Sequence, residues 1–126
     1  SRRVVMTPDD LWQFSLLQYA NQQESLLDWQ NRCGANVNFA LACQYLDKVG
    51  LSLTEGQINT LHNFSVDFER QFTVPLRQLR SQYKSQQSQF ELYPKIRQLL
   101  LNAELEVEKQ QQHDHINSRF RVMDFV

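Results

Sequence analysis

The stretch that decides the fold is residues 37–46, VNFALACQYL. Asn36 stands before it as a typical N-cap, and Gly50 stands just after it as a typical helix end. Apolar side chains cover nearly all sides of this helix, whereas a helix on the surface of a protein has one apolar stripe. We therefore expect residues 36–49 to form a central helix against which the rest of the chain packs.

Two further helices are predicted before the central one. Thr7 and Pro8 are typical of a helix start, and the apolar periodicity continues to about residue 20. Asn21, followed three positions later by Glu24, matches a capping box and indicates that a second helix begins there. This second helix is expected to end at Gly34.

The second half of the chain predicts up to three more helices. Thr54 with Gln57 forms another capping box, and apolar residues recur at helical spacing until Pro75. Pro75 is expected to break or kink this helix and to start the next one. A final helix is predicted from about residues 91–94 to residue 112. The resulting expectation is an all-α fold, a single compact domain of five to six helices with its helical core in residues 8–112.

The two ends of the chain are β-prone rather than helical. Residues 1–6 and 118–126 are rich in valine, methionine and phenylalanine and lie outside the helical periodicity. Two interpretations stay open for them. They either pair as a short two-stranded ribbon or form extended tails that are not part of the native fold.

Composition and charge narrow the class of protein. Of the 126 residues, 41% are hydrophobic, which is enough for one domain with its own core. Three glycines and three prolines leave few turn residues for a protein of many strands. The net charge of −1 gives no whole-protein field that would attract polyanions, so any anion site must be a local patch.

The cysteines and the hydropathy of the sequence indicate the cellular compartment of the protein. Cys33 and Cys43 do not form a CxxC pair, and two cysteines beside a core of this size favour reduced thiols over a disulfide scaffold. The amino end carries no apolar leader segment, and no apolar run is long enough for a membrane span. We therefore expect a cytoplasmic protein that does not bind membranes.

Three motifs carry a resemblance to a known family. They are LWQFSLLQY at residues 11–19, GANVN at residues 34–38 and PLRQLRSQYK at residues 75–84. Over about residues 10–115 the chain resembles a gammaproteobacterial family of conserved proteins of unknown function. The resemblance implies an all-helical cytoplasmic protein without established catalytic residues. Ser81 stands where the family pattern has an arginine, and Asn21 where it has a Pro-Gly step.

A basic run is the first candidate site. Between residues 70 and 97, six basic side chains accompany one acidic residue, Glu91. Arg77, Arg80 and Lys84 have the spacing i, i+3, i+7 and share one helix face next to the apolar residues of that helix. This face is predicted to be a docking ridge for an acidic partner, a phosphate or a nucleic-acid backbone. The alternative is that one arginine pairs with an acid on a neighbouring helix while the others are solvated.

Asn38 is the second candidate, because its amide falls in the first turn of the most buried helix. A buried amide must be hydrogen-bonded. Asn38 either ties its helix to a neighbouring backbone or lines a small pocket with Trp12 or Tyr19. Trp29 extends this aromatic set, which could form a groove for a partner.

Metal and catalytic chemistry find little support in the sequence. His113 and His115 flank an aspartate, but residues at i and i+2 point away from each other on a helix, so no metal or other cofactor is expected. The sequence has no nucleophile elbow, no phosphate-binding glycine loop and no HExxH motif. The chain is therefore not expected to be an enzyme, although this remains open.

The preferred function is that of a non-enzymatic interaction or regulatory protein. It would dock an unknown protein partner through the basic helix face or the aromatic groove. The first alternative is a protein that associates with nucleic acid through the same ridge, which the near-neutral charge does not favour. The second alternative is a small ligand-binding protein or enzyme with a pocket near Asn38.

Overall fold

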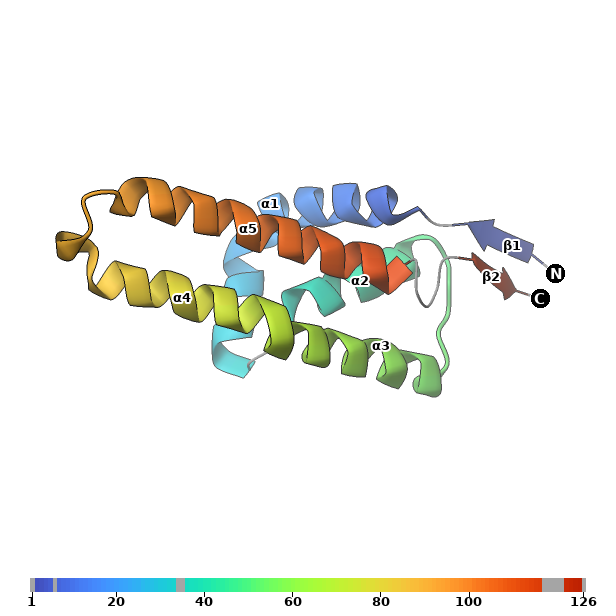
Figure 1. Cartoon of the computed structure of the whole chain (residues 1–126). Coiled ribbons are helices and arrows are strands. Elements are labelled where there is room, and N and C mark those ends of the chain that lie inside the picture. Colours follow the sequence, from blue (N-terminus) through green and yellow to red (C-terminus); the bar gives the residue numbers. More distant parts are fainter. Residues whose placement is uncertain (1, 6, 34–35, 117–121, 126) are drawn as a thin grey trace.

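The structure is a bundle of helices with a short ribbon at one end (Figure 1). The computed structural model describes residues 2–5, 7–33, 36–116 and 122–125. Its elements, in chain order, are β1 (Arg2–Val5), α1 (Pro8–Cys33), α2 (Val37–Lys48), α3 (Glu55–Phe68), the π-helix η1 (Glu69–Thr73), α4 (Val74–Ser85), the 3₁₀ turn η2 (Gln87–Gln89), α5 (Tyr93–Asp114) and β2 (Val122–Phe125). The predicted all-helical class is confirmed.

The number of separate helices is lower than the predicted five to six. In the described part of the chain, α3, η1 and α4 follow one another without a gap and form one long rod. Residues 8–33 likewise form one helix, α1. The described helices therefore make four rods, and both of the predicted breaks that are missing have a local explanation.

The first missing break is at Asn21, where the capping-box pattern predicted a new helix. The chain stays helical there and only kinks at Gln22, whose φ of −125° and ψ of 18° are not helical. The Gln22 amide donates to the Gln18 side chain at 2.6 Å and so bridges the kink. Because neither glycine nor proline stands at this point, nothing forces the helix to end.

The second expected break is at Pro75, which stands in the first turn of α4 as predicted, although the rod stays continuous there. A proline inside an α-helix lacks an N–H donor, and its ring crowds the carbonyl four residues earlier. Here the preceding turn widens into the π-helix η1, in which the Val74 N–H bonds to the Glu69 carbonyl five residues back. The wider turn accommodates Pro75, and the helix continues instead of breaking.

The caps of the central helix and of α3 are confirmed. The Asn36 side chain accepts a hydrogen bond from the Phe39 N–H at 2.9 Å. Thr54 and Gln57 exchange both bonds of a capping box. Gly50 follows α2 with a φ of +80°, the left-handed conformation that glycine adopts without strain.

The core is built around α2, as the sequence predicts. Ala42 and Leu46 belong to one buried cluster and Val37 and Leu41 to another. The helix contacts α1, α3 and α5. Each face of α2 thus meets a different neighbour, which explains why its sequence is apolar on nearly all sides.

The ends of the chain and the α4–α5 pair complete the architecture. Strand β1 pairs antiparallel with β2, with Arg2 opposite Phe125, so the ribbon interpretation of the ends holds. Helices α4 and α5 pack against each other, and their connecting end extends beyond the rest of the bundle (Figure 1). None of the helices in the described residues combines the length and apolar character needed to span a membrane.

The position of Leu41 in the core can be tested by truncation. Its side chain is 2% exposed, so Leu41→Ala should lower the free energy of unfolding by about 2–5 kcal/mol. Leu17 is 57% exposed, and Leu17→Ala should change stability by no more than about 0.5 kcal/mol. Urea denaturation of both variants measures the difference. Equal losses would mean that Leu41 is not a core residue.

Candidate ligand-binding cavity

A cavity of about 450 Å³ lies among α1, α2, η1, α4 and α5. Its wall is apolar where α1, α2 and part of α5 face it and charged where η1, α4 and the rest of α5 face it. The lining residues are Trp12, Ser15, Leu16, Tyr19, Val37, Asn38, Leu41, Glu69, Arg77, Arg80, Leu101, Glu104, Leu105 and Glu108. Residues from both candidate sites of the sequence therefore meet in one place.

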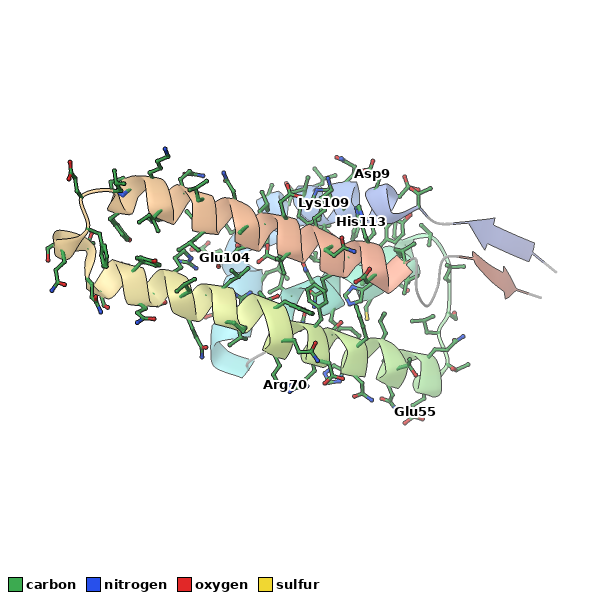
Figure 2. The ribbon with its side chains drawn as sticks, in the orientation of Figure 1. Asp9, Glu55, Arg70, Glu104, Lys109 and His113 are labelled. Atoms are coloured by element: carbon green, nitrogen blue, oxygen red, sulfur yellow. The ribbon has the colours of Figure 1, made fainter. Side chains whose placement is uncertain are left out.

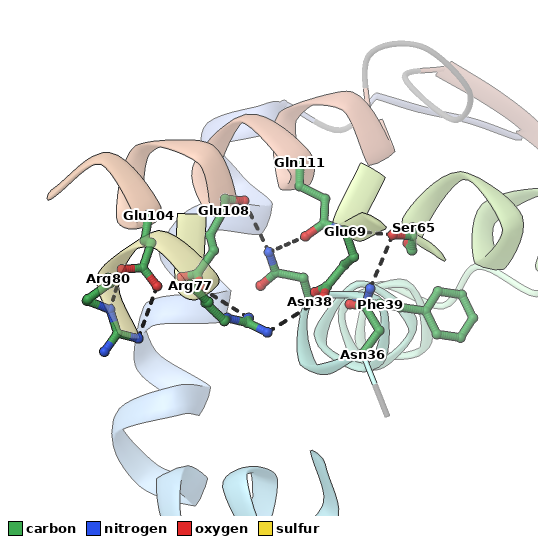
Figure 3. A network of polar contacts seen from close by, with 10 residues as sticks. All are labelled: Asn36, Asn38, Phe39, Ser65, Glu69, Arg77, Arg80, Glu104, Glu108 and Gln111. Atoms are coloured by element: carbon green, nitrogen blue, oxygen red, sulfur yellow. Dashed lines mark hydrogen bonds and ion pairs between the residues drawn. The ribbon is translucent and has the colours of Figure 1, made fainter. Parts of the chain in front are cut away.

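Asn38, Trp12 and Tyr19 all line this cavity. The Asn38 amide donates to the Glu108 carbonyl oxygen at 3.2 Å and to the Gln111 side-chain oxygen at 2.7 Å (Figure 3). Asn38 thus ties α2 to α5 and faces the cavity at the same time, so the two alternatives for this residue do not exclude each other. The side chain of Trp29 lies outside the described residues.

The strongest ion pair of the site joins α4 to α5. Arg80 donates from Nε to Glu104 Oε2 at 2.6 Å and from a terminal nitrogen to Oε1 at 3.2 Å (Figure 3). The side chain of Glu104 is only 8% exposed. The hydrogen bond to Glu104 raises the pKa of Arg80 above its usual range. A two-bonded pair of this kind fixes the orientation of both side chains.

A second, looser group of charges lies beside this pair. Arg77 stands 3.8 Å from a carboxylate oxygen of Glu69 and 3.8 Å from one of Glu108 (Figure 3). Burial raises the pKa of both glutamates, and the Arg77 charge opposes that rise. The Arg77 guanidinium therefore interacts with two partly desolvated carboxylates.

The predicted ridge differs from what the structure contains. Arg77 and Arg80 turn toward glutamates of the cavity, whereas Lys84 is exposed and lies outside the lining. In Figure 2, Arg70 lies on the outer side of the long rod, where it pairs with Asp67 one turn away. The three ridge residues therefore do not form one free cationic face. The reason is that α4 packs against α5, which brings Arg77 and Arg80 to the glutamates Glu108 and Glu104. A role for them in binding a partner stays a prediction.

The glutamates of the cavity are residues that the sequence reasoning missed. Neither candidate site of the sequence includes Glu104 or Glu108, yet Glu104 is buried and Glu108 half-buried. One signal could have located them. Leu100 belongs to the apolar stripe of the last helix. Glu104, Glu108 and Gln111 follow it at spacings of four, four and three residues, so they lie on the same face.

A buried hydrogen-bond chain lies behind the cavity, and the sequence did not predict it. The His115 ring bonds through Nδ1 to the Gln112 side-chain oxygen at 2.7 Å and through Nε2 to the Ser65 hydroxyl at 2.5 Å. The Gln112 amide then donates to the Ser15 hydroxyl at 3.0 Å. Burial lowers the pKa of His115 to about 3, so the ring is neutral near pH 7. Ser65, His115 and Gln112 are at most 1% exposed, so these three members hold helices together, and only Ser15 at the end of the chain reaches the cavity wall.

His113 and His115, the pair considered for a metal, face different surroundings. His115 is fully engaged in the buried chain, whereas His113 Nε2 is buried without a hydrogen-bond partner among the described residues. The described ranges hold no group of three or more histidine, cysteine or acidic side chains placed to bind a metal ion.

Comparison with known proteins identifies the family of this chain but assigns no activity to it. The model of a family described as protein of unknown function, DUF2390, matches residues 10–114. No curated protein and no solved structure matches the chain. The family-level resemblance drawn from the three sequence motifs therefore holds.

The Arg80–Glu104 pair predicts unequal effects of two similar substitutions on α4. Arg80→Gln should lower the free energy of unfolding by about 2–4 kcal/mol, because it leaves the Glu104 carboxylate buried and unpaired. Lys84→Gln removes the same charge from an exposed position and should cost no more than about 0.5 kcal/mol. Chemical denaturation at neutral pH compares them. Equal stabilities would show that the pair contributes nothing.

His115 predicts a loss of stability in mild acid. Its pKa is about 3 in the folded protein and 6.5 in an unfolded chain, so between these values the unfolded state binds the extra proton. The free energy of unfolding should therefore fall by roughly 1 kcal/mol for each pH unit between 6.5 and about 3 from this group alone. Glu69 and Glu108 act in the opposite direction, because their raised folded pKa values add stability as the pH falls.

A variant that lacks only His115 separates the contribution of His115 to the pH dependence from those of Glu69 and Glu108. His115→Gln should show a weaker loss of stability toward acid than the parent, measured by denaturation at a series of pH values. His62→Gln changes an exposed histidine and serves as the control. A parent and a His115→Gln variant with the same pH dependence would refute a buried neutral His115.

Proposed function

We propose that this chain, which belongs to the DUF2390 family of unknown function, is a non-enzymatic protein that binds a small molecule in the cavity beside Asn38. The observation that carries the proposal is the cavity itself, where aromatic side chains of α1 and charged side chains of η1, α4 and α5 converge. In a regulatory protein, such binding would report the presence of the ligand to a partner.

The size and the lining of the cavity support this function. Sites for small molecules measure about 300–1,000 Å³ and combine apolar walls with a few polar groups. The cavity, at about 450 Å³, lies within this range. Trp12, Leu16 and Tyr19 offer contact area for an apolar body, while Asn38 and the ion pairs offer polar contacts.

The polar groups of the cavity are already held in place. Asn38 is fixed by two hydrogen bonds, and Arg80 by its two bonds to Glu104. Groups that are ordered before binding lose less entropy when a ligand arrives. This favours a preformed binding site over a surface that is organised only by its partner.

Docking of a protein partner is the second candidate, and the α4–α5 pair is the observation that favours it. Leu79, Leu92 and Leu99 on this pair are 41%, 63% and 59% exposed, and Lys84 is exposed nearby in the sequence. Association with nucleic acid is less favoured, because Arg77 and Arg80 are occupied by glutamates.

The cytoplasm remains the compartment that we propose for this activity. The support comes from the two cysteines, which fit a reducing environment better than a disulfide scaffold. Cys43 is a half-buried free thiol on α2.

Blocking the cavity tests the proposed function. A chemically diverse set of small molecules is screened for those that raise the melting temperature, since a ligand that binds only the folded state stabilises it. Leu105→Trp places a larger side chain in the cavity wall and should abolish binding of the hits by calorimetry. Leu99→Trp makes the same change on the same helix outside the lining and should leave binding intact.

A second pair on α1 repeats the comparison from another wall. Leu16 lines the cavity, whereas its neighbour Leu17 does not. Leu16→Trp should therefore weaken binding and Leu17→Trp should not. The absence of any hit, or hits that bind all four variants equally well, would refute ligand binding in this cavity.

A further inference from the structure

The charges of the cavity specify the class of ligand. Two arginines stand against three glutamates in its lining, which leaves one formal negative charge in excess. We infer that the cavity binds a small organic cation, a primary amine carried on an apolar or aromatic body, with the ammonium group beside Arg77 and in contact with the Glu69 and Glu108 carboxylates. This inference rests on the proposed function and names its ligand class.

Glu69 and Glu108 are the carboxylates with capacity to spare. Each is 3.8 Å from Arg77, which is beyond hydrogen-bond distance, and among the described contacts neither carboxylate accepts a hydrogen bond. Their side chains are 20% and 35% exposed, so both are still reachable from the cavity. An ammonium group has three donors and could bond to both carboxylates.

The energetic state of these carboxylates favours a cation. Burial raises the pKa of both, which means that Arg77 only partly compensates their negative charges. A cation that contacts both carboxylates beside Arg77 supplies the missing compensation. An anion would instead add a third negative charge to the same group.

The arginines are poorly available to an anionic ligand. Arg80 spends two donors on Glu104, and Arg77 is held between Glu69 and Glu108. A carboxylate or phosphate that approached Arg77 would lie against the two glutamates beside it, and one that replaced Glu104 would have to displace a two-bonded partner of Arg80. Removing Arg80 from Glu104 would leave a buried charge unpaired, which is costly.

The aromatic residues suit the rest of such a ligand. Trp12 and Tyr19 line the cavity together with Leu101 and Leu105. Indole and phenol rings attract cations through their faces and pack against apolar groups through their area. A ligand with an ammonium head and an apolar body would therefore match the charged and the apolar walls at once.

Three probes that share one body test the charge preference. Phenylbutylamine, phenylbutanol and phenylpentanoate carry a positive, a neutral and a negative head on the same phenylbutyl group. Their affinities are measured by calorimetry, and the fluorescence of Trp12 is followed in a Trp29→Phe variant, where it is the only tryptophan. The amine should bind at least about tenfold more tightly than the other two and should alter Trp12 fluorescence.

Removing the two carboxylates tests the assigned residues. The double variant Glu69→Gln, Glu108→Gln should bind the amine no better than the alcohol, and measurable binding of the alcohol shows that its cavity is still formed. The matched double variant Glu91→Gln, Glu106→Gln removes the same charge at two exposed positions outside the lining and should keep the preference.

The outcomes separate this inference from the proposed function. Tightest binding of the carboxylate probe, or equal binding of all three, would overturn the cation assignment but leave a ligand-binding cavity. If none of the three probes binds while the screened molecules do, the inferred ligand class is wrong. If neither the probes nor the screened molecules bind, the proposed function fails as well.

Discussion

A chain of buried hydrogen bonds from Ser15 through Gln112 and His115 to Ser65 determines where α5 lies against α1 and α3. Buried polar groups are costly unless they are paired, whereas apolar contacts tolerate small displacements. Sliding α5 by one residue would turn its side chains by about 100° and break every bond of this chain. The polar chain therefore sets the register of α5. The same register brings the glutamates one and two turns earlier on α5 to the arginines of α4.

Features that depend only on residues close together in the sequence could be predicted from it. The caps at Asn36 and Thr54 are local hydrogen bonds, and the apolar character of α2 is a local pattern. The helix ends expected at Asn21 and Pro75 do not occur, because local residues alone do not decide whether a helix ends. Each sequence signal was real, but whether a helix ends there depends on the packing of both flanking segments. A kink at Gln22 and a π turn before Pro75 kept the helices continuous.

The site could be predicted in part. The expected grouping of Asn38 with Trp12 and Tyr19 follows from placing a polar residue on the most apolar helix, and all three line the cavity. The direction of Arg77 and Arg80 could not be derived in the same way. It depends on how α4 is rotated about its axis relative to α5, and no pattern within α4 contains that rotation. The helical spacing showed that the arginines share a face, but not which helix that face meets.

The π turn Glu69–Thr73 has a consequence for how proteins of this shape could diverge. A π turn accommodates one residue more than an α turn, so deletion of a single residue there would allow α3 and α4 to join as a regular α-helix. The shorter turn would cover nearly the same rotation with one residue fewer, so the segments on either side would keep their faces. Arg77 and Arg80 would stay at the cavity and Ser65 in the core. A single codon could therefore be lost at this turn without changing what the cavity recognises, whereas the same deletion inside α4 would turn every later side chain of that helix by about 100°.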